Sequence, residues 1–205
     1  MAMVRRRAAQ APALPPAAEL PSVLLPDVIG AWAEGGQRRV LDLGPASGAT
    51  LEVLAGGPLH LRVGDVLDEL VAAVEAAADE EGGDVGAVVA ERLAGAGDGY
   101  HLVLAWDLFS HLPAAGVAAA AARLARCLAP GGLLHAFVST GAHVCRPPAA
   151  YALLAPDRLL RRAAGKPVAA RVYHQHRLRA LLPPLVLRRA VLLRHGMQEL
   201  LLGLS

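Results

Sequence analysis

An acidic residue and two glycines stand close together in the stretch LDLGPASGAT, residues 41–50. Asp42 ends an apolar run, and a buried carboxylate is costly unless a partner satisfies it. Gly44 and Gly48 follow, and glycines at such spacing let the backbone turn tightly or approach a ligand closely. Asp42 would repel phosphates, and the turn lacks the third glycine of the dinucleotide pattern GxGxxG. The stretch therefore favours a ligand that carries an ammonium group, with a bare tight turn as the alternative.

A second carboxylate, Asp65, follows the run LHLRV and stands 23 positions after Asp42. In nucleotide-binding units, a carboxylate about 20 residues beyond the glycine turn accepts hydrogen bonds from ribose hydroxyls. Aspartate is also a favoured helix N-cap, and the run VLDELV that follows has a helical pattern. The two roles are compatible, and we expect Asp65 to contact a ribose.

The segments that must position these residues alternate between short strand-like runs and helical runs. Such alternation is typical of right-handed βαβ crossovers, which give a parallel sheet with helices on both faces. The last two runs are both strand-like and are joined by Arg-His-Gly, which predicts an antiparallel hairpin. We therefore expect an α/β fold, doubly wound, with a mostly parallel seven-stranded sheet and a C-terminal antiparallel hairpin. The predicted strands are 39–43, 59–63, 86–91, 100–106, 133–140, 184–193 and 197–204, and the predicted helices are 24–34, 49–56, 67–81 and 114–128.

Composition and charge limit the classes of function. The chain has 205 residues, enough for one domain with a sizeable core, and its formal charge of +2 is too small to predict a nucleic-acid partner. No run reaches the roughly 18 apolar residues that span a bilayer, and the two cysteines give neither a disulfide framework nor a metal-type spacing. We expect a cytoplasmic protein without a metal site or a membrane partner, with a mobile Ala/Pro-rich arm over residues 1–20 and a single domain over 21–205.

These motifs, taken in order, resemble those of the class I S-adenosylmethionine-dependent methyltransferases. VLDLGPASG, residues 40–48, is similar to the family's first motif, approximately V-L-D-x-G-x-G-x-G, with Ala46 in place of the middle glycine. LRVGDV is similar to the second-strand motif, AERL to the segment that holds the adenine, YHLVLAWDLFSHL to the fourth-strand motif and LAPGGLL to the segment before strand five. His101 stands where an aspartate is common. The resemblance covers roughly residues 38–204.

The resemblance implies S-adenosylmethionine as the cofactor, bound beyond the carboxyl ends of the strands. It places the glycine turn against the cofactor, Asp65 on the ribose, and Glu91 with the Arg92 backbone beside the adenine. For Glu91, a merely solvated strand end is an equal alternative. The cofactor-binding residues that the resemblance implies are Asp42, Gly44, Pro45, Ala46, Ser47, Gly48, Asp65, Val66, Glu91, Arg92, Trp106 and Asp107.

No catalytic group stands out from the sequence. His111 follows the predicted fourth strand, where this family meets its substrate, and is a candidate for catalysis and for substrate contact; a structural histidine is the alternative. Residues 141–173 are the expected substrate cover. Tyr151 lies within this cover and His174 directly follows it, so both are further candidates for substrate contact. His174 and His176 read HQH, but a third ligand of suitable spacing is missing, so an exposed loop or helix start is favoured over a metal pair.

Arginines gather in DRLLRRAAGK, residues 157–166. Arg158, Arg161 and Arg162 have the i, i+3, i+4 spacing of one helix face, which would suit an anionic substrate. A solvated face is the favoured alternative, because arginine is the ordinary basic residue of this chain.

Two functions are compatible with these residues. The first is methyl transfer to a small-molecule acceptor, mainly by alignment of a nucleophile with the sulfonium. The cofactor carries its own activated methyl group, and positioning alone supplies on the order of 7–11 kcal/mol. The second is a methyltransferase-like module that binds the cofactor or a protein partner without turnover, which Ala46, His101 and the lack of an identifiable base favour.

Overall fold

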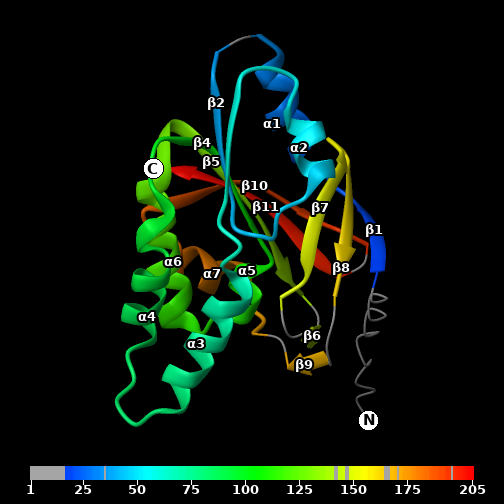
Figure 1. Ribbon diagram of the computed structural model, residues 1–205. Coiled ribbons are helices and arrows are strands. Elements are labelled where there is room, and N and C mark those ends of the chain that lie inside the picture. The colour runs from blue at the N-terminus through cyan, green and yellow to red at the C-terminus, as the bar shows by residue number, and fades with distance from the viewer. Residues whose placement is uncertain are drawn as a thin grey trace, which may run out of the picture.

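The computed structural model describes residues 17–34, 36–140, 143–145, 148–163, 167–169, 171–194 and 196–205. Its centre is a six-stranded sheet (Figure 1). In chain order the strands of this sheet are β2 (Arg38–Asp42), β3 (Leu59–Val63), β4 (Tyr100–Trp106), β5 (Leu128–Ser139), β10 (Leu185–Leu192) and β11 (Met197–Leu204). Their order across the sheet is β10-β11-β5-β4-β2-β3.

The strand order reverses beside β2. This strand pairs in parallel with β3 on one side and with β4 on the other, and β4 pairs in parallel with β5. β11 runs antiparallel to β5, and β10 runs antiparallel to β11. The chain therefore steps outward from β2 to β3 and then returns past β2 to β4. Open α/β sheets bind ligands at such a switch point, beyond the carboxyl ends of the strands.

Helices and a small second sheet cover the two faces of the central sheet (Figure 1). On one face α6 contacts β4, β5 and β10, and α4 packs between α3 and α6. Val117, Ala121 and Leu124 of α6 are fully buried at helical spacing, which explains why this helix forms as predicted. None of the helices among the described residues is long and apolar enough to cross a membrane. The helices are α1 (Leu25–Gly30), η1 (Ala31–Glu34), α2 (Gly48–Leu54), α3 (Leu67–Asp79), α4 (Val85–Arg92), η2 (Ala94–Ala96), α5 (Leu108–His111), α6 (Ala114–Cys127) and α7 (Gln175–Leu181).

The second sheet lies beside α2. It is antiparallel, in the order β1-β8-β7, and is built from β1 (Ala17–Pro21), β7 (Ala150–Ala155) and β8 (Arg158–Arg162). β6 (His143–Cys145) and β9 (Pro167–Ala169) form a separate antiparallel pair. Residues 17–20, predicted to belong to a mobile arm, are thus part of a strand, and residues 1–16 lie outside the described residues. The described part of the expected cover over 141–173 consists mainly of strands.

The prediction of a strand over 86–91 is wrong, because these residues form α4. The Asp84 carboxylate accepts a hydrogen bond of 3.0 Å from the Ala87 backbone N–H and caps the helix. Val89 and Leu93, one turn apart, are buried, which is the spacing of a helix face. With this helix in place of a strand, the central sheet has six strands, and β3 is its edge within the part of the chain that the structure describes.

The other predicted strands lie close to their observed bounds. β3 and β4 match the predictions of 59–63 and 100–106, and β2 begins one residue earlier than predicted. β5 begins at Leu128 instead of at 133, because Leu128 already pairs with Tyr100 before the register shifts. Gly131, within the shifted segment, has a φ of +75° that favours glycine.

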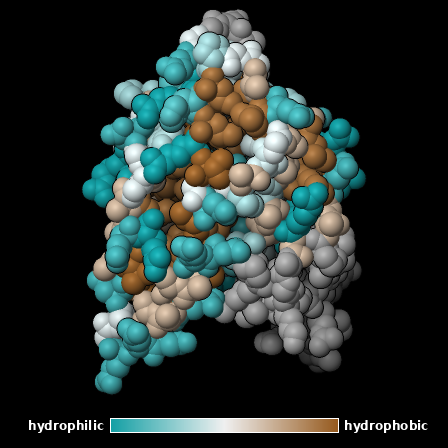
Figure 2. Space-filling view, in the orientation of Figure 1, coloured by the Kyte–Doolittle hydropathy of each residue, from teal (hydrophilic) through white to brown (hydrophobic). Residues whose placement is uncertain are grey.

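The uncovered edge leaves apolar side chains on the surface. Figure 2 shows a hydrophilic turn between α3 and α4, whereas apolar side chains gather over the upper part of the same face, where α2 and β3 lie. Leu51 of α2 and Val63 of β3 are 48% and 37% exposed. Single exposed apolar residues of this kind are common and assign no partner.

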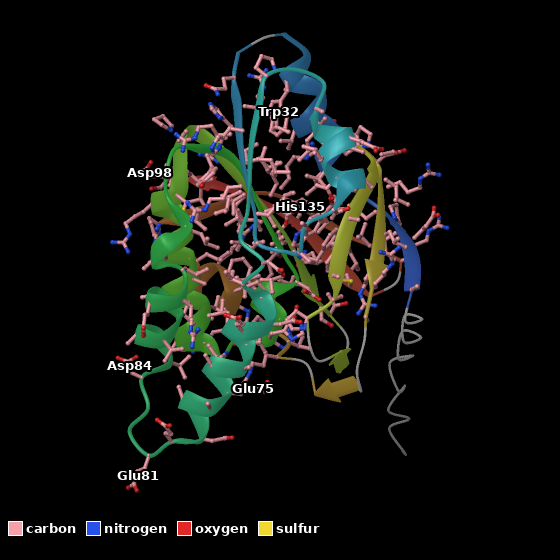
Figure 3. All side chains as sticks on the ribbon, viewed as in Figure 1. Trp32, Glu75, Glu81, Asp84, Asp98 and His135 are labelled. Carbon is pink, nitrogen blue, oxygen red and sulfur yellow. The ribbon has the colours of Figure 1, made fainter. Side chains whose placement is uncertain are left out.

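A buried carboxylate, Glu199 of β11, fixes the start of the chain to the sheet. It accepts hydrogen bonds from the Ser22 hydroxyl (2.5 Å), the Val23 N–H (2.7 Å) and the Leu24 N–H (3.3 Å), and lies 2.8 Å from Nε2 of His135. His135 lies in the middle of the molecule (Figure 3). Burial alone would raise the pKa of Glu199, but His135, Ser22 and Val23 together hold this pKa below its ordinary value of 4.5.

Replacement of this carboxylate tests its role as an anchor. We expect Glu199→Gln to lower the free energy of unfolding by about 3 kcal/mol, because it removes one partner of a buried pair. The lowered pKa means that the carboxylate's contribution is present above pH 4.5 and is lost as the pH falls further, so the gap between parent and variant should narrow in acid. Urea unfolding measures both effects. Glu52→Gln, on the exposed side of α2, is the control, and equal losses at the two positions would contradict the anchor.

Candidate functional site

The carboxylate at the end of β2 is bound by the chain itself. Asp42 is buried, and its Oδ1 accepts hydrogen bonds from the Gly44 N–H (2.9 Å) and from the Trp106 indole Nε1–H (2.6 Å). Burial raises the pKa of Asp42 from 3.8 to about 6; the two hydrogen bonds oppose this rise, and the charge of Asp65 adds to it. The carboxyl group that was predicted to face a cation therefore already has an indole partner.

The two glycines of the turn have different surroundings. A Cβ atom at Gly44 would lie 2.8 Å from Trp106 Nε1, so at this position the close approach that requires glycine is to the indole. A Cβ atom at Gly48 would meet nothing within 4 Å. Between them, Ser47 caps α2 by accepting a hydrogen bond of 3.3 Å from the Thr50 N–H.

Two residues at this edge of the sheet have left-handed backbone conformations. Asp65, after β3, has a φ of +46°, and Trp106, the last residue of β4, has a φ of +47°. They are the non-glycine residues of the described chain with positive φ, and such conformations cost on the order of 1–3 kcal/mol and gather at functional sites. Asp65 is exposed, and α3 is capped at Val66 with no side-chain hydrogen bond, so Asp65 does not serve as the N-cap.

A buried acid and a buried histidine follow β4. Oδ2 of Asp107 lies 3.5 Å from Nε2 of His111, 3.4 Å from the Tyr151 hydroxyl and 3.4 Å from the Ala149 N–H. Both nitrogens of His111 and Oδ1 of Asp107 lack a hydrogen-bond partner among the described residues. Burial raises the pKa of Tyr151 well above its ordinary value, and Asp107 adds to this rise while Arg161 opposes it.

Tyr151 sits between two other rings. Its ring is stacked on Trp106 with centroids 5.1 Å apart and planes 3° from parallel, and on Phe137 with centroids 5.6 Å apart and planes 17° from parallel. All three side chains are at most 2% exposed. Strand β7 thereby places an aromatic ring against the indole that contacts Asp42 and approaches Gly44.

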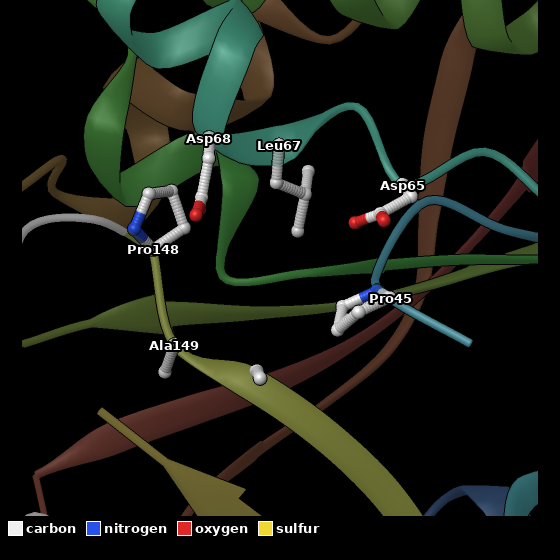
Figure 4. Close-up of a pocket in the computed structure, with 7 residues that line it drawn as sticks. Pro45, Asp65, Leu67, Asp68, Pro148 and Ala149 are labelled. Atoms are coloured by element: carbon white, nitrogen blue, oxygen red, sulfur yellow. The ribbon is translucent and has the colours of Figure 1, made fainter. Parts of the chain in front are cut away.

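The space left at the carboxyl ends of the strands is small. A cavity of about 80 Å³ remains there, whereas sites for small molecules and cofactors usually measure about 300–1,000 Å³. Figure 4 shows Pro148 and Ala149 on one side of this cavity and Asp65 with Pro45 on the other. The donors and acceptors suit a ribose and a cationic group, but this cavity has no room for a nucleoside-sized cofactor. The cavity is lined by Pro45, Asp65, Leu67, Asp68, Pro148, Ala149 and Ala150.

Comparison with known proteins shows a similarity to one family. Residues 40–132 match the model of the family described as "Methyltransferase domain". This segment is therefore similar to a methyltransferase domain. The whole fold agrees: the PH0226 protein of Pyrococcus horikoshii OT3 is similar with a TM-score of 0.53 and 11% identity, with 88% of each chain covered. The CcbJ methyltransferase of Streptomyces caelestis is similar with a TM-score of 0.50 and 16% identity, with 88% of this chain and 89% of that chain covered.

These findings confirm the resemblance to class I S-adenosylmethionine-dependent methyltransferases for family and fold. No curated protein matches the sequence at a significant level. Within the matched segment, β2, β3 and β4 bring Asp42, Asp65 and Asp107 to one edge of the sheet, as the motif order predicted.

Some predicted site residues lie elsewhere. Glu91 and Arg92 are exposed on the helix α4 and not at a strand end, and Arg92 pairs with Glu69 at 3.8 Å. His174 is exposed at the start of α7, where its ring stacks against His176. Of the other predicted cofactor-binding residues, Ala46 in the glycine turn is exposed, and Val66 before α3 is half-buried. The described residues include no group of three or more His, Cys, Asp or Glu placed to hold a metal ion.

The departure at His101 has a structural role away from the crevice. It lies near the start of β4, at the opposite end of the strand from Asp107, and its Nδ1 accepts a hydrogen bond of 3.1 Å from the Arg39 N–H. The presence of His101 where an aspartate is common is therefore compatible with a cofactor at the carboxyl ends of the strands.

The sequence interpretation missed the strands that close the crevice. The run AYALLAPDRLLRR places two apolar segments on either side of Pro156 and Asp157, which is a hairpin signal. Arg158 and Arg161, predicted to share a helix face, instead lie on a strand, where Arg158 is exposed and Arg161 is buried. Alternation along β8 explains this difference.

The indole contact predicts opposite effects at the two glycines. We expect Gly44→Ala to lower the free energy of unfolding by about 1–3 kcal/mol, because its methyl group would overlap the Trp106 ring. Gly48→Ala, at the first position of α2 and in open space, should be neutral or slightly stabilising. Urea unfolding of both variants measures the difference. Equal stability of the two variants would show that the indole does not occupy the place described.

The raised pKa of Asp42 predicts a pH dependence. Because the folded carboxyl binds a proton more tightly than the unfolded one, its contribution to stability falls as the pH rises from about 3.8 to about 6, by about 3 kcal/mol in total. Asp42→Asn removes this titration, so the variant should gain on the parent between pH 4 and pH 7 in urea unfolding. The exposed Asp79→Asn is the control. Parallel pH profiles for the parent and Asp42→Asn would refute the assignment.

Proposed function

We propose that this protein transfers a methyl group from S-adenosylmethionine to a small-molecule acceptor. The observation that carries the proposal is the meeting of Asp42, Asp65 and Asp107 at the switch point of the sheet, within the residues that match the family. Three carboxylates at one edge favour a ligand with positive charge, and S-adenosylmethionine carries both an ammonium and a sulfonium group.

Each carboxylate has a separate proposed role. Asp65 is exposed beside this cavity, so its carboxylate is available to ribose hydroxyls. Asp42 would face the ammonium group once the Trp106 indole moved away. Asp107 and His111 lie deepest, and their unpaired atoms leave them available to an acceptor. Because the cavity between these residues and β7 is too small for the cofactor, these roles belong to a state in which β7 has moved.

A second candidate function is a methyltransferase-like module without turnover. One observation favours it: the chain's own Trp106 and Tyr151 fill the crevice beside the glycine turn. Such a module would bind the cofactor or a protein partner without turnover, and the filled crevice favours the form that binds a protein partner and not the cofactor.

Cofactor binding separates the two functions. Calorimetry with S-adenosylmethionine and S-adenosylhomocysteine should show binding, with NAD as the comparison ligand. We expect Asp65→Ala to weaken binding of S-adenosylhomocysteine by about 1.5–3 kcal/mol, because it removes hydrogen bonds to a charged group.

Glu69→Ala is the matched control, since Glu69 is also a carboxylate at the start of α3 and is exposed on the side of Arg92. It should leave the affinity unchanged. Equal weakening at both positions would mean that the carboxylates act through the helix and not through the ribose. If neither the parent nor a variant with an opened crevice bound S-adenosylmethionine or S-adenosylhomocysteine, the module would be favoured.

A further inference from the structure

We propose that strand β7 is an internal competitor for the cofactor crevice: Tyr151 and the segment 148–150 occupy the place of the ligand, which binds only when β7 leaves. The identity of the ligand rests on the proposed function. The closure itself rests on contacts within the chain.

The start of β7 contacts three separate walls of the crevice. The Tyr151 ring covers the Trp106 indole, with centroids 5.1 Å apart. The Ala149 N–H points to the Asp107 carboxylate after β4. The Leu153 N–H donates a hydrogen bond of 3.0 Å to the Thr50 hydroxyl of α2. Beside these contacts, the described residues line a cavity of about 80 Å³, which Figure 4 shows.

The closed arrangement leaves polar groups poorly satisfied, which is why it can yield to a ligand. The Ala149 N–H is 3.4 Å from Asp107 Oδ2, near the upper limit for a hydrogen bond. Both His111 nitrogens and Asp107 Oδ1 are buried without a hydrogen-bond partner among the described residues. A core built only for stability would pair these atoms, because each unpaired buried group has a cost.

The opposite end of the β7–β8 hairpin is fixed. Its turn is tied to the start of the chain by a hydrogen bond of 2.8 Å from the Ser22 N–H to the Asp157 carbonyl, and β8 pairs with β1. Ser22 in turn donates to the buried Glu199. The hairpin is therefore held at its turn, while the end at Pro148 lies over the crevice (Figure 4). Displacement of β7 at that end leaves the anchor intact.

Whether Thr50→Ala strengthens or weakens ligand binding tests the competition between β7 and the ligand. Thr50→Ala removes the acceptor for the Leu153 N–H and destabilises the closed state, so we expect S-adenosylhomocysteine to bind about 5- to 10-fold more tightly, in proportion to the larger open fraction. Thr50→Ser keeps the acceptor and should bind like the parent. If β7 instead completed a ready-made site, Thr50→Ala would bind more weakly. Weaker or unchanged binding in calorimetry, with unchanged exposure of Trp106, overturns the proposal.

A second measurement needs no cofactor. The chain has two tryptophans, so Trp32→Phe leaves Trp106 as the single indole fluorophore. In this background, quenching by acrylamide should be weak for the parent and about 5- to 10-fold stronger for Thr50→Ala. Thr50→Val also removes the hydroxyl acceptor but keeps the volume of the side chain, and it carries the same test should Thr50→Ala fail to fold. Unchanged quenching in a folded variant refutes the closure.

The two readouts separate this inference from the proposed function. Stronger quenching without binding of S-adenosylhomocysteine by any variant would support closure by β7 and reject the cofactor. Tight binding by the parent with no change in Thr50→Ala would support the cofactor and reject the closure.

Discussion

The buried carboxylate of Glu199, on β11, holds residues 22–24 against the central sheet, and much of the remaining structure depends on this contact. It binds backbone and side-chain donors of residues 22–24 and the imidazole of His135 in the middle of the sheet. A charge buried in this way is stable only with all of these partners. The anchored segment directly follows β1 in the chain. β1 pairs with β8, and β8 holds β7 in register with Tyr151 opposite Arg161. The position of the Tyr151 ring in the crevice thus depends on Glu199, a residue near the C-terminus.

The crevice itself combines favourable apolar packing with unfavourable polar burial. Stacking of Tyr151 between Trp106 and Phe137 buries three large rings, and such contacts stabilise the closed state. The same closure leaves Asp107 and His111 incompletely paired and holds Trp106 in a left-handed conformation. A core arranged only for packing would not contain these incompletely paired side chains or this strained backbone conformation. Their presence at the carboxyl ends of the strands is the physical reason to read this edge as a site that exchanges its occupant.

Local signals predicted the frame of the fold well, whereas contacts between distant residues were out of reach. β3 and β4 are apolar runs with clear ends, and their bounds follow from the sequence. Residues 86–91 misled the prediction because an apolar run of that length fits a buried strand as well as a helix; the Asp84 cap was the local signal for the helix. Tyr151 was expected to contact a substrate, but its stacking on Trp106 depends on the pairing of β7, β8 and β1, which no local pattern specifies. The Glu199 contacts span more than 170 positions for the same reason.

The ionisation of Asp42 makes the competition between β7 and a cationic ligand depend on pH. β7 brings no cation to Asp42, and burial together with the charge of Asp65 raises the pKa of that carboxyl to about 6. Near this pH the closed state can hold Asp42 in its protonated form, so closure needs no countercharge. A cationic ligand, in contrast, favours the ionised carboxylate and would displace a proton as it bound. Closure by β7 and binding of a cation therefore respond oppositely to pH, and rising pH through about 6 shifts the balance from the strand towards the ligand.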